Sequence, residues 1–206
     1  MRNFQYFLLE GYGILAPNIR GSAGYGRDYL ALDNYKNRQN SIRDICEGAK
    51  WLVDRGYAKF GKIGIKGGSY GGYATLAALV ACPEAFGAGV DDIGISNFVT
   101  FLRNTAPYRR ALREAEYGPL SDEAFLREIS PLTHVDKIRA PLLIVHGAND
   151  PRVPVGEARQ MAEAIRARGG IVDTLIFADE GHGAAKLSNR LVYYRKMVDF
   201  FDKHLK

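Results

Sequence analysis

Short apolar runs alternate with amphipathic stretches along most of the chain. The runs have the length of β-strands, and the amphipathic stretches repeat their apolar residues at the spacing of an α-helix. Strands that alternate with helices are typical of a parallel sheet with helices on both faces, so the sequence predicts an α/β fold. The expected strands are 13–17, 62–66, 88–95, 141–147 and 171–177, and the expected helices are 1–10, 41–55, 74–79, 155–168 and 191–205.

Two of these elements carry specific signals. Residues 141–147 (PLLIVHG) are continuously apolar, as in a strand that is covered on both faces. The helix at 41–55 has Ser41 and Asp44 in a capping-box arrangement, and Gly56 is expected to end it. The inward face of this helix is expected to carry Ile42, Ile45, Ala49 and Leu52.

Residues 96–130 show no regular period and are predicted to be irregular. An insertion of this kind could form a lid over an active site, and ordinary packing would explain its aromatic residues equally well. These aromatic residues are Phe98, Phe101, Tyr108, Tyr117 and Phe125.

The length of 206 residues suits a single domain, spanning 1–206, with a sizeable core. Hydrophobic residues make up 47% of the chain and charged residues 25%, which is ordinary for a soluble globular protein. The net charge is +5, but basic and acidic residues are interspersed and no Lys/Arg block occurs. A dispersed excess of this kind indicates a solvated surface, so no nucleic-acid partner is expected.

Two cysteines, Cys46 and Cys82, lie in helical patterns and are predicted to be buried free thiols. Free thiols suit a reducing compartment. The N-terminus lacks the basic-then-apolar pattern of a signal peptide, and no apolar run approaches 18 residues. The sequence thus predicts a soluble, cytoplasmic protein with no membrane partner.

The strongest candidate for chemistry is the stretch 62–79, KIGIKGGSYGGYATLAAL. It places G-x-S-x-G between a strand and a helix, the setting of a nucleophile elbow. The glycines at 67, 68, 71 and 72 are expected to relieve collisions in the sharp turn. Ser69 would then stand exposed at the positive end of the helix dipole, and the backbone N–H of Tyr70 would face a developing oxyanion.

Two further loops follow predicted strands and carry suitable groups. Asp150 comes after the strand at 141–147, and His182 comes after the strand at 171–177. Chemistry in such folds gathers at the carboxyl ends of strands, and Ser, Asp, His is the chain order of α/β-hydrolases. Histidine can take the serine proton near neutral pH, and a carboxylate can orient the imidazole.

Other histidines and acids compete for these roles. His146 lies inside an apolar strand and is predicted to be a core residue, while His134 falls in a charged amphipathic stretch and His204 near the C-terminus. Asp179 and Glu180 share a loop with His182 and are predicted to shape it. A metal site from His146, Asp150 and His182 is conceivable, but no metal-ligand spacing motif supports it.

Four stretches together resemble the catalytic domain of the prolyl oligopeptidase family, near its acylaminoacyl-peptidase-like members. They cover the chain nearly end to end: APNIRGSAGYGRDY, WLVDRGYAKFGKIGIKGGSYGGYAT, SPLTHVDKIRAPLLIVHGANDPRVP and FADEGHG. By position, the resemblance implies Ser69 as nucleophile, Asp150 as acid and His182 as base. It also implies that Arg152 holds a substrate carbonyl, or is otherwise a plain surface arginine, and that no cofactor or metal is needed.

The chain departs from this family in two respects. The β-propeller that normally screens substrates is absent, and so is the opening of the hydrolase domain with its His-Gly-Gly-Pro-like stretch. The resemblance therefore implies an N-terminally truncated α/β-hydrolase that lacks an interior strand and a second oxyanion donor. Losing one such donor typically costs about 10²–10³ in rate.

Three functions remain open on the sequence alone. The first is a serine-type peptidase that hydrolyses short peptides or acyl-peptides through an acyl-enzyme. The second is a carboxylesterase with the same triad, because an ester demands less of a half-built oxyanion hole. The third is an inactive fragment that needs its missing N-terminal strands. The expected partner is a short peptide or ester substrate, with a homo-oligomer also possible.

Overall fold

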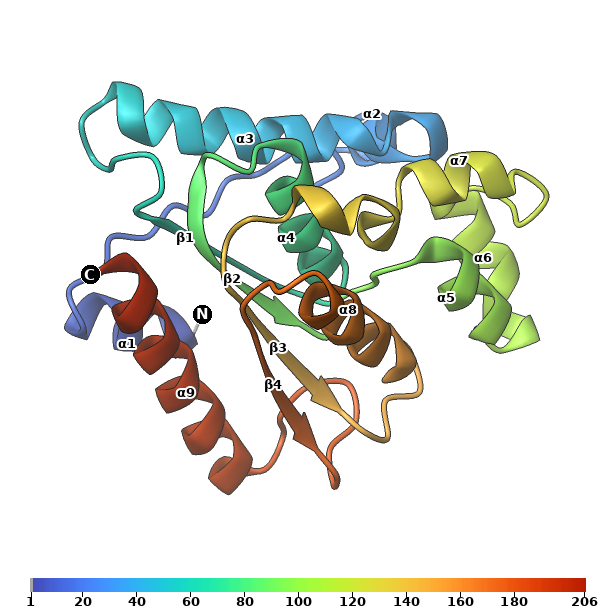
Figure 1. Cartoon of the computed structure of the whole chain (residues 1–206). Helices are drawn as coiled ribbons and strands as arrows, with labels where there is room; N and C mark the ends of the chain where they lie inside the picture. Colours follow the sequence, from blue (N-terminus) through green and yellow to red (C-terminus); the bar gives the residue numbers. More distant parts are fainter. Residues whose placement is uncertain (1) are drawn as a thin grey trace.

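Four parallel strands form the centre of the computed structural model, which describes residues 2–206 (Figure 1). The strands lie side by side in sequence order, β1-β2-β3-β4. Each connection between parallel neighbours must cross over a face of the sheet. The α/β fold predicted from the alternation of elements is confirmed. The strands are β1 (Ile63–Gly68), β2 (Phe86–Asp92), β3 (Leu142–Gly147) and β4 (Val172–Phe177).

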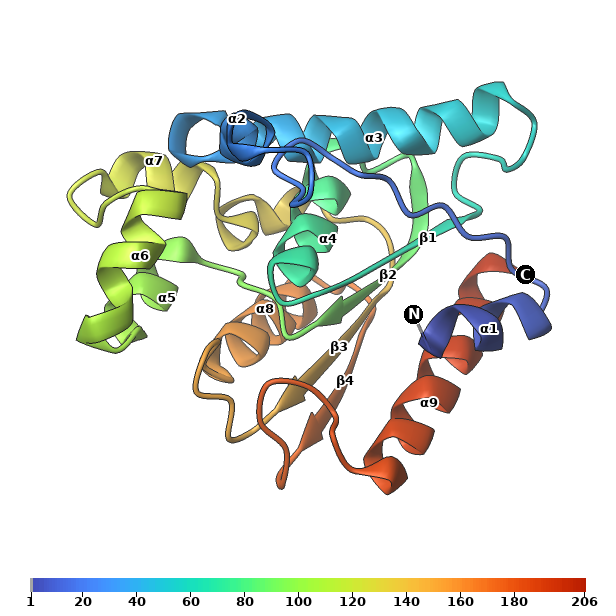
Figure 2. The same cartoon turned by 180° about the vertical axis from the view of Figure 1, so that it is seen from behind.

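Helices cover both faces of the sheet, and each face has its own apolar core (Figures 1 and 2). One core lies beneath α3 (Gln39–Asp54), α4 (Tyr70–Ala81) and α8 (Gly156–Ala167). The other lies beneath α9 (Leu187–Leu205), where α1 (Arg2–Leu9) also packs. The predicted helices 1–10, 155–168 and 191–205 therefore exist, with bounds that differ by a few residues, and Met1 of the first prediction lies outside the described residues.

The central strand behaves as its apolar run predicts, because every residue of β3 is buried. Register also aligns the carboxyl ends of neighbouring strands. Gly68 of β1 pairs with Asp92 of β2, and Gly147 of β3 pairs with Phe177 of β4. The loops that follow β1, β3 and β4 consequently leave the sheet at one edge, where side chains from distant parts of the chain can meet.

The prediction that residues 96–130 are irregular is wrong, because they form three helices. Asn97 caps the first of them by accepting a hydrogen bond from the N–H of Val99, and Pro107 begins the second. Phe98, Phe101 and Tyr117 are buried against the α4 face of the sheet, whereas Tyr108 is exposed. Two of these helices span only six and seven residues, too few turns for a period to be recognised. The three helices are α5 (Phe98–Asn104), α6 (Pro107–Tyr117) and α7 (Glu123–Glu128).

Residues 13–17 do not form the predicted strand. They form no helix or strand, they are exposed, and no described strand pairs with them. A strand needs a neighbour that satisfies its backbone groups, and an apolar run alone does not supply one. Among residues 2–206, β1 likewise has a strand on one side only.

The helix predicted at 41–55 begins earlier, at Gln39, and the capping box at its start is wrong. Ser41 lies inside the helix, fully buried, and its hydroxyl donates to the carbonyl of Arg38 at 3.0 Å. Asp44 instead forms an ion pair with Arg20 at 2.6 Å. The sequence has the residues of a capping box, but in the structure their side chains bond other groups and do not cap the helix.

The prediction of two free thiols is also wrong, because Cys46 and Cys82 form a disulfide. The bond joins α3 to the residue that follows α4. The argument for a reducing compartment therefore loses its basis, since disulfides persist mainly in oxidising environments. The cytoplasmic location stays a prediction without this support.

Short elements complete the described chain. They are α2 (Arg27–Leu30) and the 3₁₀ helices η1 (Ala31–Asp33), η2 (Tyr35–Asn37) and η3 (Pro131–Lys137). Within residues 2–206, no helix is both long enough and apolar enough to cross a bilayer.

Candidate active site

Ser69 stands at the sharp turn between β1 and α4, with φ of 58°. Positive φ is uncommon for a residue with a side chain and signals local strain when the surrounding structure holds it. The holding contacts are present. The N–H of Ser69 donates to the carbonyl of Asp92 at 2.8 Å, and its carbonyl accepts from the N–H of Gly72 at 2.9 Å. The sequence therefore places a serine hydroxyl at the tip of a braced turn.

Only two of the four glycines around this turn are required by space. A Cβ on Gly67 would lie 2.1 Å from the carbonyl oxygen of Gly71, and one on Gly72 would lie 2.5 Å from Asp91. A Cβ on Gly68 would make ordinary contacts, and one on Gly71 would meet nothing within 4 Å. The expectation that all four relieve collisions is corrected to Gly67 and Gly72.

Three side chains from separate loops meet at the carboxyl edge of the sheet. The Nε2 atom of His182 lies 3.0 Å from Oγ of Ser69, and its Nδ1 atom lies 2.7 Å from Oδ2 of Asp150. The three residues lie 113 and 32 positions apart along the chain, so only the fold brings them together. The chain thus has an alcohol, an imidazole and a carboxylate in one hydrogen-bonded row.

The carboxylate of Asp150 is held from two sides. Its Oδ1 atom accepts from the backbone N–H groups of Arg152 and Val153, at 2.7 Å and 3.0 Å. Burial by itself would raise the pKa of Asp150, but the hydrogen bonds from His182, Val153 and Arg152 together hold that pKa below its usual value. Asp150 is therefore an anion fixed in orientation beside the imidazole.

The loop that carries His182 is braced by the acids beside it. Glu180 accepts from the N–H groups of Ala185 and Lys186, and Asp179 pairs with the side chain of Lys186. The prediction that Asp179 and Glu180 shape this loop is confirmed. Gly147 lets the loop approach β3, because a Cβ there would lie 2.1 Å from the carbonyl oxygen of Gly181.

The other histidines lie in different surroundings. His146 is buried, and its Nε2 atom lies 2.9 Å from the carbonyl oxygen of Val153, so the prediction of a core histidine is confirmed. Burial lowers its pKa. His134 contacts the carbonyl of Glu128, and His204 lies against the ring of Phe200. No group of three metal-ligating side chains occurs within the described residues 2–206.

The two remaining predicted residues flank this row. Tyr70 is the first residue of α4, so its backbone N–H has no acceptor within the helix. Arg152 lies exposed on the loop of Asp150. Both positions are compatible with contact to a bound molecule.

Sequence reasoning missed the surroundings of the Tyr70 side chain. Its hydroxyl donates to Asp33, which forms a buried ion pair with Arg38. No periodic pattern or motif marks Asp33 or Arg38. The signal that the sequence does carry is a pair of opposite charges five positions apart.

Comparisons with known proteins place this arrangement in context. The model of the prolyl oligopeptidase family matches residues 1–206. Dipeptidyl aminopeptidase BIII of Pseudoxanthomonas mexicana is 38% identical over 195 residues, which is 92% of this chain but 28% of that protein. The chain therefore spans less than a third of this relative.

Solved structures are similar over nearly the whole chain. A puromycin-hydrolyzing peptidase of Mycobacterium tuberculosis matches with a TM-score of 0.93 and 32% identity, over 99% of this chain and 31% of that one. An acylaminoacyl peptidase of Pyrococcus horikoshii matches with a TM-score of 0.92 and 28% identity, over 100% of this chain and 34% of that one.

Proposed function

Because the chain belongs to the prolyl oligopeptidase family and has its α/β-hydrolase fold, we propose that it is the catalytic portion of a serine-type peptidase. The observation that carries the proposal is the hydrogen-bonded row of Ser69, His182 and Asp150. Relatives that are named as peptidases support the same class of reaction.

In the proposed reaction, Oγ of Ser69 attacks the carbonyl carbon of the scissile bond while Nε2 of His182 takes the serine proton. The π electrons of the carbonyl bond move onto its oxygen, and the backbone N–H of Tyr70 donates a hydrogen bond to the resulting oxyanion. The bond to the leaving amine then breaks, and His182 returns the proton to that amine. Asp150 holds the imidazole in the required tautomer and stabilises its charged form.

The acyl group now rests on Ser69 as an ester. Water attacks this ester, His182 takes a proton from the water, and the released Ser69 oxygen recovers a proton from His182. Atoms balance as one water consumed and one acyl–nitrogen bond cleaved. No cofactor or metal takes part in any step of the proposed cycle.

The proposed substrates are short peptides or acyl-peptides, with Arg152 holding a backbone carbonyl near the cleaved residue. Support for the substrate class comes from the relatives, whose names include an aminopeptidase and an acylaminoacyl peptidase. Support for Arg152 is its exposed position on the Asp150 loop. The buried aromatic residues of the segment 96–130 pack into the core. A lid role for this segment stays a prediction.

The decisive experiment treats the purified chain with a fluorophosphonate probe and maps the modified residue by mass spectrometry. We expect a single adduct on Ser69, with none in Ser69→Ala, and a large loss of labelling rate in His182→Ala. A folded chain that stays unlabelled would overturn the proposal and favour an inactive fragment.

A second measurement separates a peptidase from an esterase. Turnover of an aminoacyl anilide is compared with that of a nitrophenyl ester carrying the same acyl group. We expect both to be hydrolysed, with Ser69→Ala inactive on each. Ester turnover without any anilide turnover would favour a carboxylesterase with the same three residues.

A further inference from the structure

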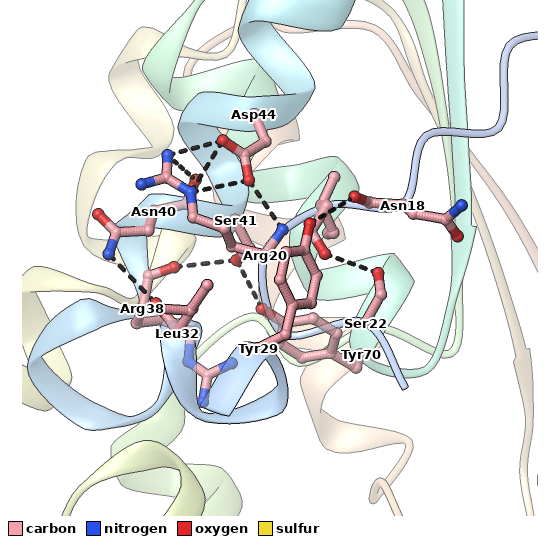
Figure 3. A network of polar contacts seen from close by, with 11 residues as sticks. Asn18, Arg20, Ser22, Tyr29, Leu32, Arg38, Asn40, Ser41, Asp44 and Tyr70 are labelled. Carbon is pink, nitrogen blue, oxygen red and sulfur yellow. Dashed lines mark hydrogen bonds and ion pairs between the residues drawn. The ribbon is translucent and has the colours of Figure 1, made fainter. Parts of the chain in front are cut away.

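The side chain of Tyr70 is anchored at its far end. Its hydroxyl donates to Oδ2 of Asp33 at 2.7 Å and lies 2.8 Å from Oγ of Ser41 on α3. Figure 3 shows the ring of Tyr70 reaching from the start of α4 to Ser41 and lying beside Arg38. The residue whose backbone faces the reacting atoms is thus tied through its side chain to a different part of the fold.

Asp33 is the stronger of the two anchors. Ser41 has one hydroxyl proton and two possible acceptors, the carbonyl of Arg38 and the oxygen of Tyr70. Asp33 is buried, and its Oδ2 atom receives both the Tyr70 hydroxyl and Nη1 of Arg38, each at 2.7 Å. Hydrogen bonds to ionised groups are shorter and stronger than neutral ones.

Arg38 fixes the carboxylate in turn. Only 1% of Arg38 is exposed, and its Nη2 atom donates to the carbonyl of Glu116 at 2.6 Å. Its guanidinium lies 5.0 Å from the ring centre of Tyr70 and 4.9 Å from that of Tyr117. A planar cation that lies against two aromatic rings and donates to a carbonyl is held in orientation as well as in place.

The loop around Gly21 closes over the same carboxylate. A Cβ on Gly21 would lie 2.3 Å from the Asp33 carboxyl, and Gly21 has φ of 91°, a conformation that favours glycine. Asp33 therefore has little room to move. The segment at 31–38, the end of α6 and the start of α4 are joined by one buried polar cluster.

We propose that Asp33, held by Arg38, is a positioning residue for the backbone N–H of Tyr70. It anchors the phenol and thereby fixes the peptide plane that follows Ser69. That plane needs an anchor, because the N–H of the first helical residue has no partner within the helix. The inference rests on the proposed serine hydrolase function.

The protonation of the phenol agrees with a donor role. Burial raises the pKa of Tyr70 to about 12, although the charge of Arg38 opposes the rise. At neutral pH the hydroxyl therefore keeps its proton and can donate a hydrogen bond to Asp33.

The test compares two tyrosines on α4. Tyr70→Phe removes the anchored hydroxyl and leaves the ring and the Asp33–Arg38 pair in place. Tyr73→Phe is the matched control, because the Tyr73 hydroxyl is buried without a hydrogen-bond partner among the described residues. We expect kcat for a nitrophenyl ester to fall about 10- to 100-fold in Tyr70→Phe with KM nearly unchanged, and no change in Tyr73→Phe.

A second pair of variants tests Asp33 itself. Asp33→Asn should lower kcat in the same way. The double variant Asp33→Asn/Tyr70→Phe should have a kcat no lower than that of the slower single variant, because both changes break the same Tyr70–Asp33 hydrogen bond. Asp54→Asn is the control, because Asp54 lies at the opposite end of α3 from Ser41 and forms an exposed ion pair with Lys50. Multiplicative losses in the double variant would overturn the proposal, as would equal losses in Asp54→Asn.

One spectroscopic measurement keeps the two proposals separable. In protein labelled with ¹⁵N-tyrosine, the amide resonance of Tyr70 should shift in Asp33→Asn and stay in place in Asp54→Asn. An unlabelled Ser69 with this shift present would end the proposed function and leave the anchor standing. If the wild type is active and Asp33→Asn shows neither the shift nor a lower kcat, only the positioning role is overturned. If Asp33→Asn does not fold, a Tyr70→Phe variant with the kcat of the wild type overturns the positioning role instead.

Discussion

At the scale of single residues, Asp91 shows most clearly how position changes chemistry. In the sequence it interrupts an apolar strand, and in the structure it is buried on the α4 side of β2. Its carboxyl fills space left by Gly72 and Gly94, where a Cβ would lie 2.5 Å and 2.1 Å from its Oδ1 atom. Burial, and to a smaller extent the charge of Asp92, raises the pKa of Asp91 to about 7.

This raised pKa makes stability depend on pH in a definite direction. The unfolded carboxyl loses its proton near pH 4, whereas the folded one keeps it up to about pH 7. The native state binds the extra proton between these values, so the stabilisation is fully present below about pH 4 and is lost as pH rises to about 7. Replacing the carboxyl by a neutral amide removes this dependence.

We therefore expect Asp91→Asn to flatten the pH profile of unfolding. Between pH 5 and pH 8, the free energy of unfolding of the wild type should fall by on the order of 3 kcal/mol more than that of the variant, at about 1.4 kcal/mol per pKa unit. Urea unfolding followed by circular dichroism at both pH values measures this difference. Parallel profiles for the two proteins would contradict the prediction.

At the scale of elements, the disulfide between Cys46 and Cys82 is a contact that the sequence did not predict. It ties α3, which carries the Ser41 contact to Tyr70, to the end of α4, which begins at Tyr70. Thirty-six positions separate the two cysteines. Spacing alone does not reveal such a pairing, because two helices meet through the packing of their apolar faces and not through local pattern.

Reduction of this bond should destabilise the fold. A cross-link across 36 positions lowers the entropy of the unfolded chain enough to contribute about 3–4 kcal/mol. We expect a reductant to lower the urea midpoint of the wild type by a corresponding amount. The double variant Cys46→Ser/Cys82→Ser is the control and should unfold at the lower midpoint with or without reductant. The expectation would be contradicted if the urea midpoint of the wild type stays the same in reductant while a thiol assay shows that both cysteines are reduced.

The helices α5, α6 and α7 teach a similar lesson about elements. Their aromatic residues were visible in the sequence, but an open choice remained between a lid and ordinary packing. Burial of Phe98, Phe101 and Tyr117 favours packing for these three, and Tyr108 is left exposed. The sequence could not decide, because short helices give too few turns for a period to be recognised.

At the scale of the whole molecule, pairing in the sheet distinguishes segments that are stable from segments that are weakly held. β3 is paired on both sides and buried throughout, whereas residues 13–19 are not in a strand and their N–H groups donate no backbone hydrogen bond within the described chain. Local opening costs little free energy where backbone groups already face water.

Amide hydrogen exchange should reproduce this division. Residues 13–19 are expected to exchange near the rate of an unfolded peptide, and the amides of β3 to exchange only through global unfolding. Mass spectrometry of peptic fragments measures both in one experiment, with β3 as the internal control. Slow exchange at 13–19 would show that these residues are paired, contrary to the structure.

The sequence by itself determined the class of fold, the buried central strand and the strand–turn–helix around Ser69. These features are local: a period of two or 3.6 residues and the steric needs of a tight turn can be read from neighbouring positions. The order of Ser69, Asp150 and His182 also named the candidate residues, and their catalytic roles stay predictions.

Only the tertiary structure decided which groups touch. It set the distances within the row of Ser69, His182 and Asp150, left residues 13–17 outside the sheet and formed the disulfide. It also gave the phenol of Tyr70 its buried acceptor. Each of these outcomes depends on partners that are remote along the chain. Hydrogen bonding, burial and charge act through space, so no local pattern of residues records them.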